Sequence, residues 1–240
     1  DTGHQLPKVE DWEDPSYARY VQWRYHAVEE HAAAMRRVID ACGEDKAYLA
    51  EIPGPNSVRW SLQGGLDIST AGQYFDFMAC PCFVIGRDSY GSLHFPSPIY
   101  GSVEVAKYLN TIGNGRTGVV LYSHLEQTSR YTAEPETDLR VWMAGTIAGG
   151  GSFWDCTFLG HHPGVAPDRR NIDAVAEYFH LHRDLDEHLD GCSQLADVAL
   201  VHSRLSQDRF GSDDPFQDGY VGHVRGWELA LMENHVLYTI

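Results

Sequence analysis

Short apolar runs alternate along this chain with longer stretches in which apolar residues recur at helical spacing. The short runs predict strands at 47–52, 74–79 with a continuation at 83–86, 118–125 and 152–158. The longer stretches predict helices at 102–112, 136–147 and about 171–189. The run at 118–125 has no polar alternation, which is typical of a strand buried on both faces. Strands and helices that alternate in this way predict right-handed βαβ units and a parallel sheet.

A long amphipathic helix is predicted before the first strand. Asp14 has the residue type of an N-cap, and Pro15 suits the first helical position. Apolar residues then recur at spacings of three, four and seven as far as Ile39. The helix is expected to end near Cys42 and Gly43.

The last part of the chain predicts a new βαβ unit. A strand at 196–203, a polar loop at 206–218, a helix at about 221–233 and a strand at 235–240 follow one another. Such a start cannot close a sheet by itself. We therefore expect the chain to be truncated, or to be completed by another polypeptide.

Two carboxylates fall near predicted strand ends. Glu126 follows the apolar run at 118–125 directly, and Glu51 lies in the run at 47–52. In (β/α) barrels the loops after the strands converge on one pocket, and the chemistry is built there. The alternative for Glu126 is that it caps the next segment or is simply solvated.

Composition and charge limit the classes of partner that this chain can bind. The chain has 240 residues, 43% of them hydrophobic, which is enough for a substantial core. A formal charge of −16 without any run of Lys or Arg argues against a nucleic-acid partner. No apolar stretch approaches the ~20 residues that cross a bilayer, and the chain does not begin with a signal-peptide pattern. We expect a soluble, cytoplasmic protein with no membrane partner.

The cysteines and histidines predict no metal site or cofactor. Five cysteines are an odd number in a chain too long to need disulfides, so reduced thiols are expected. Cys80 and Cys82 flank Pro81, a spacing too short for a common zinc knuckle, and are interpreted as packing residues around a bend. His180, Asp184 and His188 share a helix face that is read as solvated.

The order of several short motifs resembles a known family. They are Leu125-Glu126-Gln127-Thr128-Ser129, Ala148-Gly149-Gly150-Gly151, Phe153-Trp154-Asp155, Ala196-Asp197-Val198-Ala199-Leu200 and Gly226-Trp227-Glu228-Leu229-Ala230-Leu231. This order is similar to the second half of glycoside hydrolase family 42 and related hypothetical glycosyl hydrolases. The resemblance implies an α/β fold in which 1–193 form the C-terminal part, about strands 5–8, of a (β/α)8 TIM barrel. It also implies that 194–240 begin a flavodoxin-like domain of the β-galactosidase trimerisation type.

The resemblance also implies catalytic roles. Glu126 would be the nucleophile at the end of the seventh strand, and Glu51 would lie near the end of the fifth. The family's general acid belongs to an Asn-Glu pair on the fourth strand, which would precede Asp1. If the strand count shifts by one, Glu51 becomes the acid. A retaining glycosidase needs its two carboxyl groups about 5 to 5.5 Å apart.

Further polar and aromatic residues near the predicted strand ends and loops are candidates for binding sugar hydroxyls or sugar faces. Each has an ordinary alternative as a helix cap or a packing residue. They are Trp60, Asp76, Arg87, Asp88, His124, Trp154, Asp155, His161 and His162.

The sequence therefore predicts a β-galactosidase-like glycoside hydrolase with a carbohydrate substrate. A homo-oligomer, or a companion chain that completes the barrel, is expected. One alternative is a non-catalytic carbohydrate-binding or assembly subunit on the same scaffold. Another is a metal-dependent hydrolase that uses His161, His162 and a carboxylate.

Overall fold

The protein has a mixed α/β fold, and a computed structural model describes residues 5–54, 61–62, 64–82, 86–87, 93–94, 100–113, 118–123, 135–156, 170–211 and 219–240. The helices are α1 (Pro15–Cys42), α3 (Ile68–Ala71), the 3₁₀ turn η1 (Gly72–Tyr74), α4 (Gly101–Ile112), α5 (Glu136–Ala148), α6 (Arg170–Leu189), α7 (Arg204–Phe210) and α8 (Tyr220–Glu233). The strands are β1 (Leu49–Glu51), β2 (Phe77–Cys82), β3 (Gly86–Arg87), β4 (Leu93–His94), β5 (Gly118–Ser123), β6 (Ser152–Cys156), β7 (Val198–Ala199) and β8 (Tyr238–Thr239).

The predicted first helix is confirmed as α1. The carboxylate of Asp14 accepts a hydrogen bond of 2.8 Å from the backbone N–H of Ser16, and Pro15 is the first helical residue. The helix ends before Gly43, whose φ of 127° is favourable only for glycine. Its buried residues are Tyr17, Val21, Tyr25 and Ala32. Of the predicted apolar stripe, which runs as far as Ile39, Met35 is 36% exposed and Ile39 is only partly buried, so the first part of the stripe is the part that is buried.

Four parallel strands form the main sheet, in the order β1-β2-β5-β6. The predicted parallel sheet is therefore confirmed. The order of the strands in space follows their order in the sequence, and the antiparallel hairpin β3-β4 lies outside this sheet.

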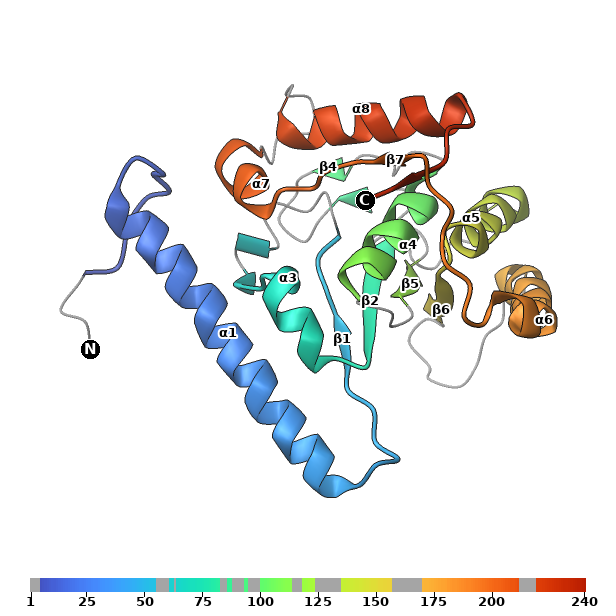
Figure 1. Cartoon of the computed structure of the whole chain (residues 1–240), viewed down its shortest axis with the longest axis horizontal. Helices are drawn as coiled ribbons and strands as arrows, with labels where there is room; N and C mark the ends of the chain where they lie inside the picture. Colours follow the sequence, from blue (N-terminus) through green and yellow to red (C-terminus); the bar gives the residue numbers. More distant parts are fainter. Residues whose placement is uncertain are drawn as a thin grey trace.

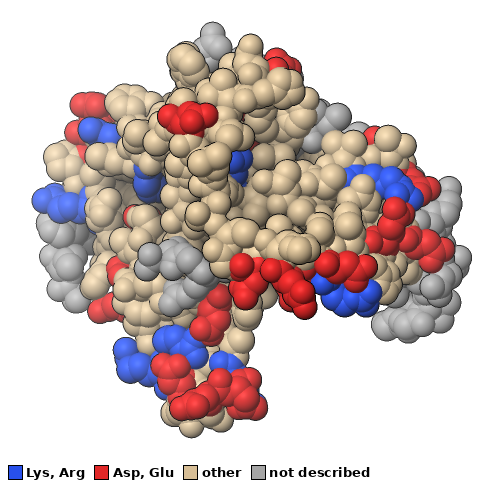
Figure 2. Space-filling view, turned by 45° about the vertical axis from the view of Figure 1, so that its right-hand side comes forward, with Lys and Arg blue, Asp and Glu red and all other residues tan. Residues whose placement is uncertain are grey.

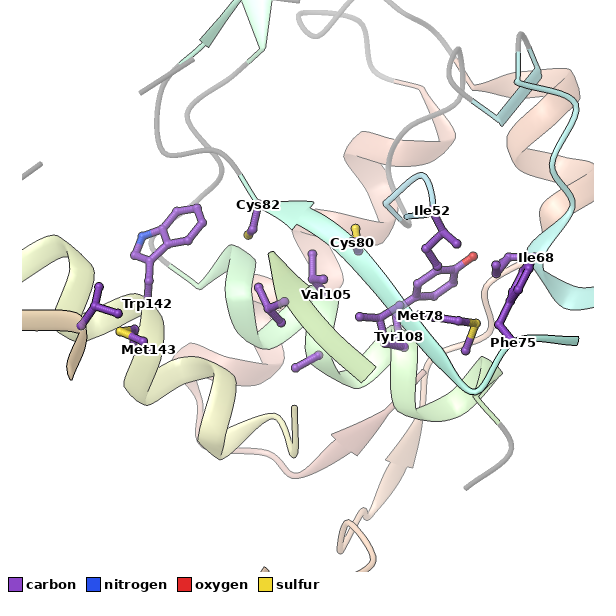
Figure 3. Close-up of a cluster of buried hydrophobic side chains, with 14 of the residues drawn as sticks. Ile52, Ile68, Phe75, Met78, Cys80, Cys82, Val105, Tyr108, Trp142 and Met143 are labelled. Atoms are coloured by element: carbon purple, nitrogen blue, oxygen red, sulfur yellow. The ribbon is translucent and has the colours of Figure 1, made fainter. Parts of the chain in front are cut away.

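Helices α4 and α5, which connect strands of this sheet, and α6, which follows β6, pack in one layer (Figure 1). Helix α4 packs on β2 and β5, α5 lies between α4 and α6, and both α5 and α6 pack on β6. One hydrophobic core lies between this layer and the sheet; Met78 of β2 and Tyr108 of α4 lie toward one end of it, Met143 of α5 lies at the other, and Cys80 of β2 lies between them (Figure 3). These four side chains are at most 5% exposed.

Gly118 allows α4 to approach the sheet closely. A Cβ atom at this position would lie 2.3 Å from the Cβ of Leu109, well inside van der Waals contact. Leu109 is fully buried. A larger residue at the start of β5 would therefore displace α4.

The expected bend at Cys80-Pro81-Cys82 is wrong, because β2 continues through all three residues. Pro81 pairs with Leu121 of β5. The carbonyl of Ala79 accepts a hydrogen bond from the backbone N–H of Ile52, on the β1 side of β2. The backbone nitrogen of Pro81, two residues further on, faces the same β1 side. Strand β1 has already ended there, and the missing N–H of Pro81 therefore costs no ladder bond. The expectation that both cysteines pack is confirmed, since their side chains are buried free thiols.

The C-terminal part of the chain forms a second parallel pair. Strand β7 pairs with β8, and α7 and α8 lie between them in the sequence. Helix α8 lies beyond this pair as seen from α4 (Figure 1). The partly buried Ile240 packs on the main core, so this C-terminal unit, residues 198–240, is in contact with the rest of the protein.

Several elements differ from the sequence-based predictions. The strands expected at 196–203 and 235–240 are only the two-residue strands β7 and β8. Helix α3 lies between the predicted strands at 47–52 and 74–79, where no helix was predicted; Asp67 caps it, and Ile68 and Ala71 are buried. Helix α7 was expected to be loop, and its N-cap is Ser203.

Acidic and basic side chains are intermixed on the surface seen in Figure 2, with no continuous Lys and Arg patch on that face. None of the described helices is long and apolar enough to cross a membrane.

Candidate functional site

The carboxyl ends of the four parallel strands lie at one edge of the main sheet. Glu51 is the last residue of β1, and Ser123 is the last residue of β5. Strand β5 lies between β2 and β6. The segment that contains Glu126 therefore begins from the middle of this edge, which is where parallel α/β folds place their ligands.

The strand register assigns the candidate residues to two faces of the sheet. Glu51 pairs with Ala79, Ala79 with Val119, and Val119 with Ser152. Paired residues point to the same face, and side chains two positions apart along a strand do so too. Trp154, two residues after Ser152, therefore shares a face with Glu51.

We call this side the exposed face and define it by Leu49, Glu51, Phe77 and Trp154. Leu49, Phe77 and Trp154 are 41%, 42% and 40% exposed, whereas Ala79 and Val119, which share this face in the middle of the sheet, are 0% and 9% exposed. The face opposite carries the buried core residues of β2 and β5. Strands β1 and β6 are three strand spacings apart, so Glu51 and Trp154 lie about 14 Å apart across the sheet.

Asp155 points the other way, toward the helix layer. It stands two residues after Phe153 and therefore shares its face, and the ring of Phe153 lies 5.5 Å from that of Phe179 on α6. The ring centroid of His182 on α6 lies 5.2 Å from that of Phe153, so this histidine packs on β6. Of the two β6 candidates, only Trp154 shares the exposed face with Glu51.

Asp76 lies at the opposite edge of the sheet, because β2 begins at Phe77. Its Oδ2 accepts hydrogen bonds of 2.5 Å from Nη1 of Arg36 and 2.7 Å from the backbone N–H of Tyr48. Arg36 also contacts Asp40 at 2.7 Å. This carboxylate ties α1 to the amino-terminal edge of the sheet, and the structure does not bring it together with Glu51.

Arg87 belongs to the β3-β4 hairpin, in which it pairs with Leu93, and only its backbone is described. The remaining candidates lie outside the described residues and stay predictions. They are Glu126, His124, Trp60, Asp88, His161 and His162.

Cys80 is a thiol of β2 close to this edge, but its environment keeps it protonated. Burial raises the pKa of its thiol, and the negative charges of Glu104 and Glu51 raise it further. A protonated, fully buried thiol is a poor nucleophile. Cys80 is therefore a packing residue.

A buried cluster of charged residues between α4 and the C-terminal unit was missed by the sequence reasoning. We call it the Glu228 cluster and define it by Glu104 and Lys107 of α4, Arg225 and Glu228 of α8, and Tyr238 of β8. Both glutamates are buried, with Glu104 4% and Glu228 2% exposed. Nε of Arg225 lies 3.8 Å from Oε2 of Glu104, which is too long for a hydrogen bond.

Glu228 has a strongly perturbed carboxyl group. Among the described residues, no group donates a hydrogen bond to either of its carboxyl oxygens. Burial and the neighbouring Glu104 raise its pKa to about 9, against the opposing effects of Arg225 and Lys107. Burial also raises the pKa of Glu104, and it lowers the pKa of Lys107. One signal in the sequence pointed here: Glu228 stands four residues after Val224, on the apolar side of α8.

A second buried cluster joins α7 to α1. We call it the Tyr25 cluster and define it by Tyr25, Arg204 and Asp208. The Tyr25 hydroxyl donates to Oδ2 of Asp208 at 2.9 Å and accepts from Nη2 of Arg204 at 2.7 Å. The same nitrogen lies 2.5 Å from Oδ1 of Asp208. Burial raises the pKa values of Tyr25 and Asp208, but each polar side chain has a partner.

Neither cluster offers a site for sugar chemistry. A glycosidase carboxyl pair has to touch its substrate, and Glu104 and Glu228 are too deeply buried to do so. Within the described part of the chain, no three His, Cys, Asp or Glu side chains are grouped so that they could hold a metal ion. The carboxyl edge of the sheet remains the candidate site.

Comparison of the chain with protein-family models, with curated proteins and with solved structures found no match.

Proposed function

We propose that this chain is part of a β-galactosidase-like glycoside hydrolase, with Glu126 as nucleophile at the carboxyl edge of the sheet. The observation that carries the proposal is the arrangement of the main sheet. Its strands are parallel, their spatial order follows the sequence, and the helices pack on one face. A sector of a (β/α)8 barrel has this arrangement, whereas a doubly wound sheet reverses its strand order.

The position of β5 adds support. Glu126 follows its last residue, Ser123, by three positions, and β5 has a neighbouring strand on both sides. In a barrel every strand has a neighbour on both sides, and a carboxylate at the C-terminal end of a strand is placed at the common pocket. The general acid is proposed to come from outside this chain, as the family resemblance implies.

The chemistry permits a test that does not depend on the missing acid. A dinitrophenyl glycoside has a leaving group that needs no protonation, so its cleavage needs the nucleophile but not the acid. We expect the protein to release dinitrophenol from such a galactoside, and Glu126→Gln to abolish the release. Glu187→Gln, an exposed change on α6, is the matched control and should behave as wild type. Equal release by wild type and Glu126→Gln would reject the proposal.

The role of Glu51 is decided by comparing leaving groups. If Glu51 were the acid, Glu51→Gln would slow the cleavage of a methyl or phenyl glycoside by about 10²- to 10⁴-fold and would spare the dinitrophenyl glycoside. The proposal expects no effect of this change on either substrate, whether the chain is assayed alone or with a companion chain.

A second candidate function is carbohydrate binding without catalysis, and exposed Trp154 favours it. Its ring is 40% exposed on the face shared with Glu51, where it can stack on a sugar. In this case oligosaccharide binding, measured by calorimetry, would be lost in Trp154→Ala and unchanged in Glu126→Gln. No variant would then show turnover.

A further inference from the structure

The contact between α4 and the C-terminal unit contains more buried charge than it can neutralise by pairing. Glu104 of α4 lies 3.8 Å from Arg225 of α8, its charge acts on Glu228 of the same helix, and both glutamates are at most 4% exposed. An isolated carboxylate in such a place is costly, and two of them also repel each other. Something in the cluster has to neutralise at least one of them.

The cations of the cluster do not reach Glu228. Nζ of Lys107 donates to the backbone carbonyl of Tyr238 at 2.7 Å and to Oε1 of Gln194 at 3.3 Å. Arg225 is nearest to Glu104, at 3.8 Å. Both cations are thus directed elsewhere, and a proton is the remaining way to neutralise Glu228.

The other groups packed around the pair do not replace that proton. Tyr238 of β8 presents its ring to Lys107, 4.6 Å from Nζ to the ring centroid. Burial and the two glutamates raise the pKa of the Tyr238 hydroxyl, which therefore stays neutral. Cys80 of β2, which feels the charge of Glu104, is also neutral. Among the described groups of this cluster, the carboxyl pair changes its charge as the pH rises from acidic to mildly alkaline, and Lys107, whose pKa is lowered by burial, is the other group that can titrate.

We propose that the Glu104–Glu228 carboxyl pair is a pH-sensitive latch, which holds α8 and β8 on α4 while it carries a proton and releases them when that proton is lost to solvent. The undocked segment exposes Glu228 to water, where an ordinary carboxyl group is ionised above about pH 4.3. The docked form keeps its proton up to about pH 9. Docking therefore weakens as the pH rises between these values and changes little outside them.

Hydrogen exchange of the whole protein tests the latch. Protection factors of the α8 amides, corrected for the pH dependence of intrinsic exchange, are measured from pH 6 to pH 9. We expect them to fall by up to about tenfold per pH unit, because one proton is released on opening. Helix α5, which lies outside the cluster, is the internal reference and should keep its protection.

Three variants sharpen the test. Glu228→Gln cannot lose a proton, so its α8 protection should not change over this pH range. Glu104→Gln should reduce the pH dependence as well, because it removes the neighbouring negative charge. Glu233→Gln, an exposed change on the same helix, should follow wild type. Constant α8 protection in the wild type, or an unchanged pH dependence in Glu228→Gln, would overturn the proposal. If Glu228→Gln does not fold, the wild-type series and Glu104→Gln decide in the same way.

Discussion

The two buried clusters that join the C-terminal unit to the rest of the protein are built from similar residues but differ in how well they are paired. In the Tyr25 cluster, one arginine, one aspartate and one tyrosine contact each other at 2.5 to 2.9 Å, although among the described residues Nε of Arg204 and Oδ1 of Asp208 have no hydrogen-bond partner. In the Glu228 cluster, two carboxyl groups share a region in which the nearest charged nitrogen lies 3.8 Å from Glu104. The first is a fixed anchor, whereas the second depends on a proton.

This difference teaches that burial alone does not decide how a charged group behaves. Burial raises the pKa of both Asp208 and Glu228. Asp208 has Arg204 and Tyr25 as partners, and both of them oppose the shift. For Glu228 the neighbouring Glu104 adds to the shift. The charge of the nearest group therefore decides the outcome. A cation beside a buried carboxylate favours its ionised form, whereas a second carboxylate favours its protonated form.

The largest effect is expected from breaking the Tyr25 cluster at its cation. Arg204→Ala leaves Asp208 buried without its countercharge and should lower the free energy of unfolding by about 3 to 5 kcal/mol. Urea unfolding at pH 7 measures this value. Arg209→Ala, an exposed change on the same helix, should cost less than about 0.5 kcal/mol. A small loss in Arg204→Ala would mean that the cluster is not an anchor.

Removal of one hydroxyl should weaken the same cluster less. Tyr25→Phe deletes the group that donates to Asp208 and accepts from Arg204, but it leaves their ion pair in place. We expect a loss of about 1.5 to 3 kcal/mol, since hydrogen bonds to charged groups are lost. Tyr20→Phe on the same helix is the control, and a cost equal to that of Tyr25→Phe would contradict this account.

In the Glu228 cluster, a substitution is expected to raise the free energy of unfolding rather than to lower it. The pKa of Glu228 is raised in the folded protein, so the folded state holds a proton that the unfolded chain has lost, and stability falls as the pH rises toward about 9. Glu228→Gln removes this dependence. At about 1.4 kcal/mol per pKa unit the shift amounts to about 5 kcal/mol at pH 8, and burial of an unpaired amide costs about 3 kcal/mol of this, so we expect a net stabilisation of about 1 to 2 kcal/mol. The gain should shrink toward pH 5. Thermal unfolding at both pH values measures it, and destabilisation at pH 8 would contradict the comparison.

The smallest effect is expected at Tyr238. Among the described residues no group hydrogen-bonds its hydroxyl, although the ring is almost fully buried. Tyr238→Phe keeps the ring beneath Lys107 and should change the unfolding free energy by less than about 0.5 kcal/mol. A loss above about 1.5 kcal/mol in the same urea assay would show that the hydroxyl has a stabilising partner.

The sequence predicted the regular elements of the main sheet because their apolar periods are long. The cap at Asp14 and Pro15, the stripe of α4 and the apolar run of β5 each indicate one structure by local rules. Pro81 was misread because a proline inside a strand is tolerated only where a neighbouring strand has ended. That condition is set by the register between β1 and β2, which no local pattern contains.

The candidate site was predictable only in part. The strand register places Glu51 and Trp154 on one face of the sheet. Both had been selected from the sequence because they lie near the ends of predicted strands. Asp76 lies instead at the amino-terminal edge, because β2 starts three residues later than its apolar pattern does. The Glu228 cluster was not predictable in detail, because Glu104 and Glu228 are separated by more than a hundred residues and meet only through tertiary packing.

Covalent trapping tests the central claim, that Glu126 is the nucleophile at the carboxyl edge of the sheet. A 2-deoxy-2-fluoro galactoside with a dinitrophenyl leaving group slows the second step of a retaining mechanism, so the sugar accumulates on the attacking carboxylate. Peptide mass spectrometry should find the added fluorosugar on the peptide that contains Glu126, with release of one dinitrophenol per label. A label on any other carboxylate, or turnover of the unfluorinated substrate without a label on Glu126, would contradict the account.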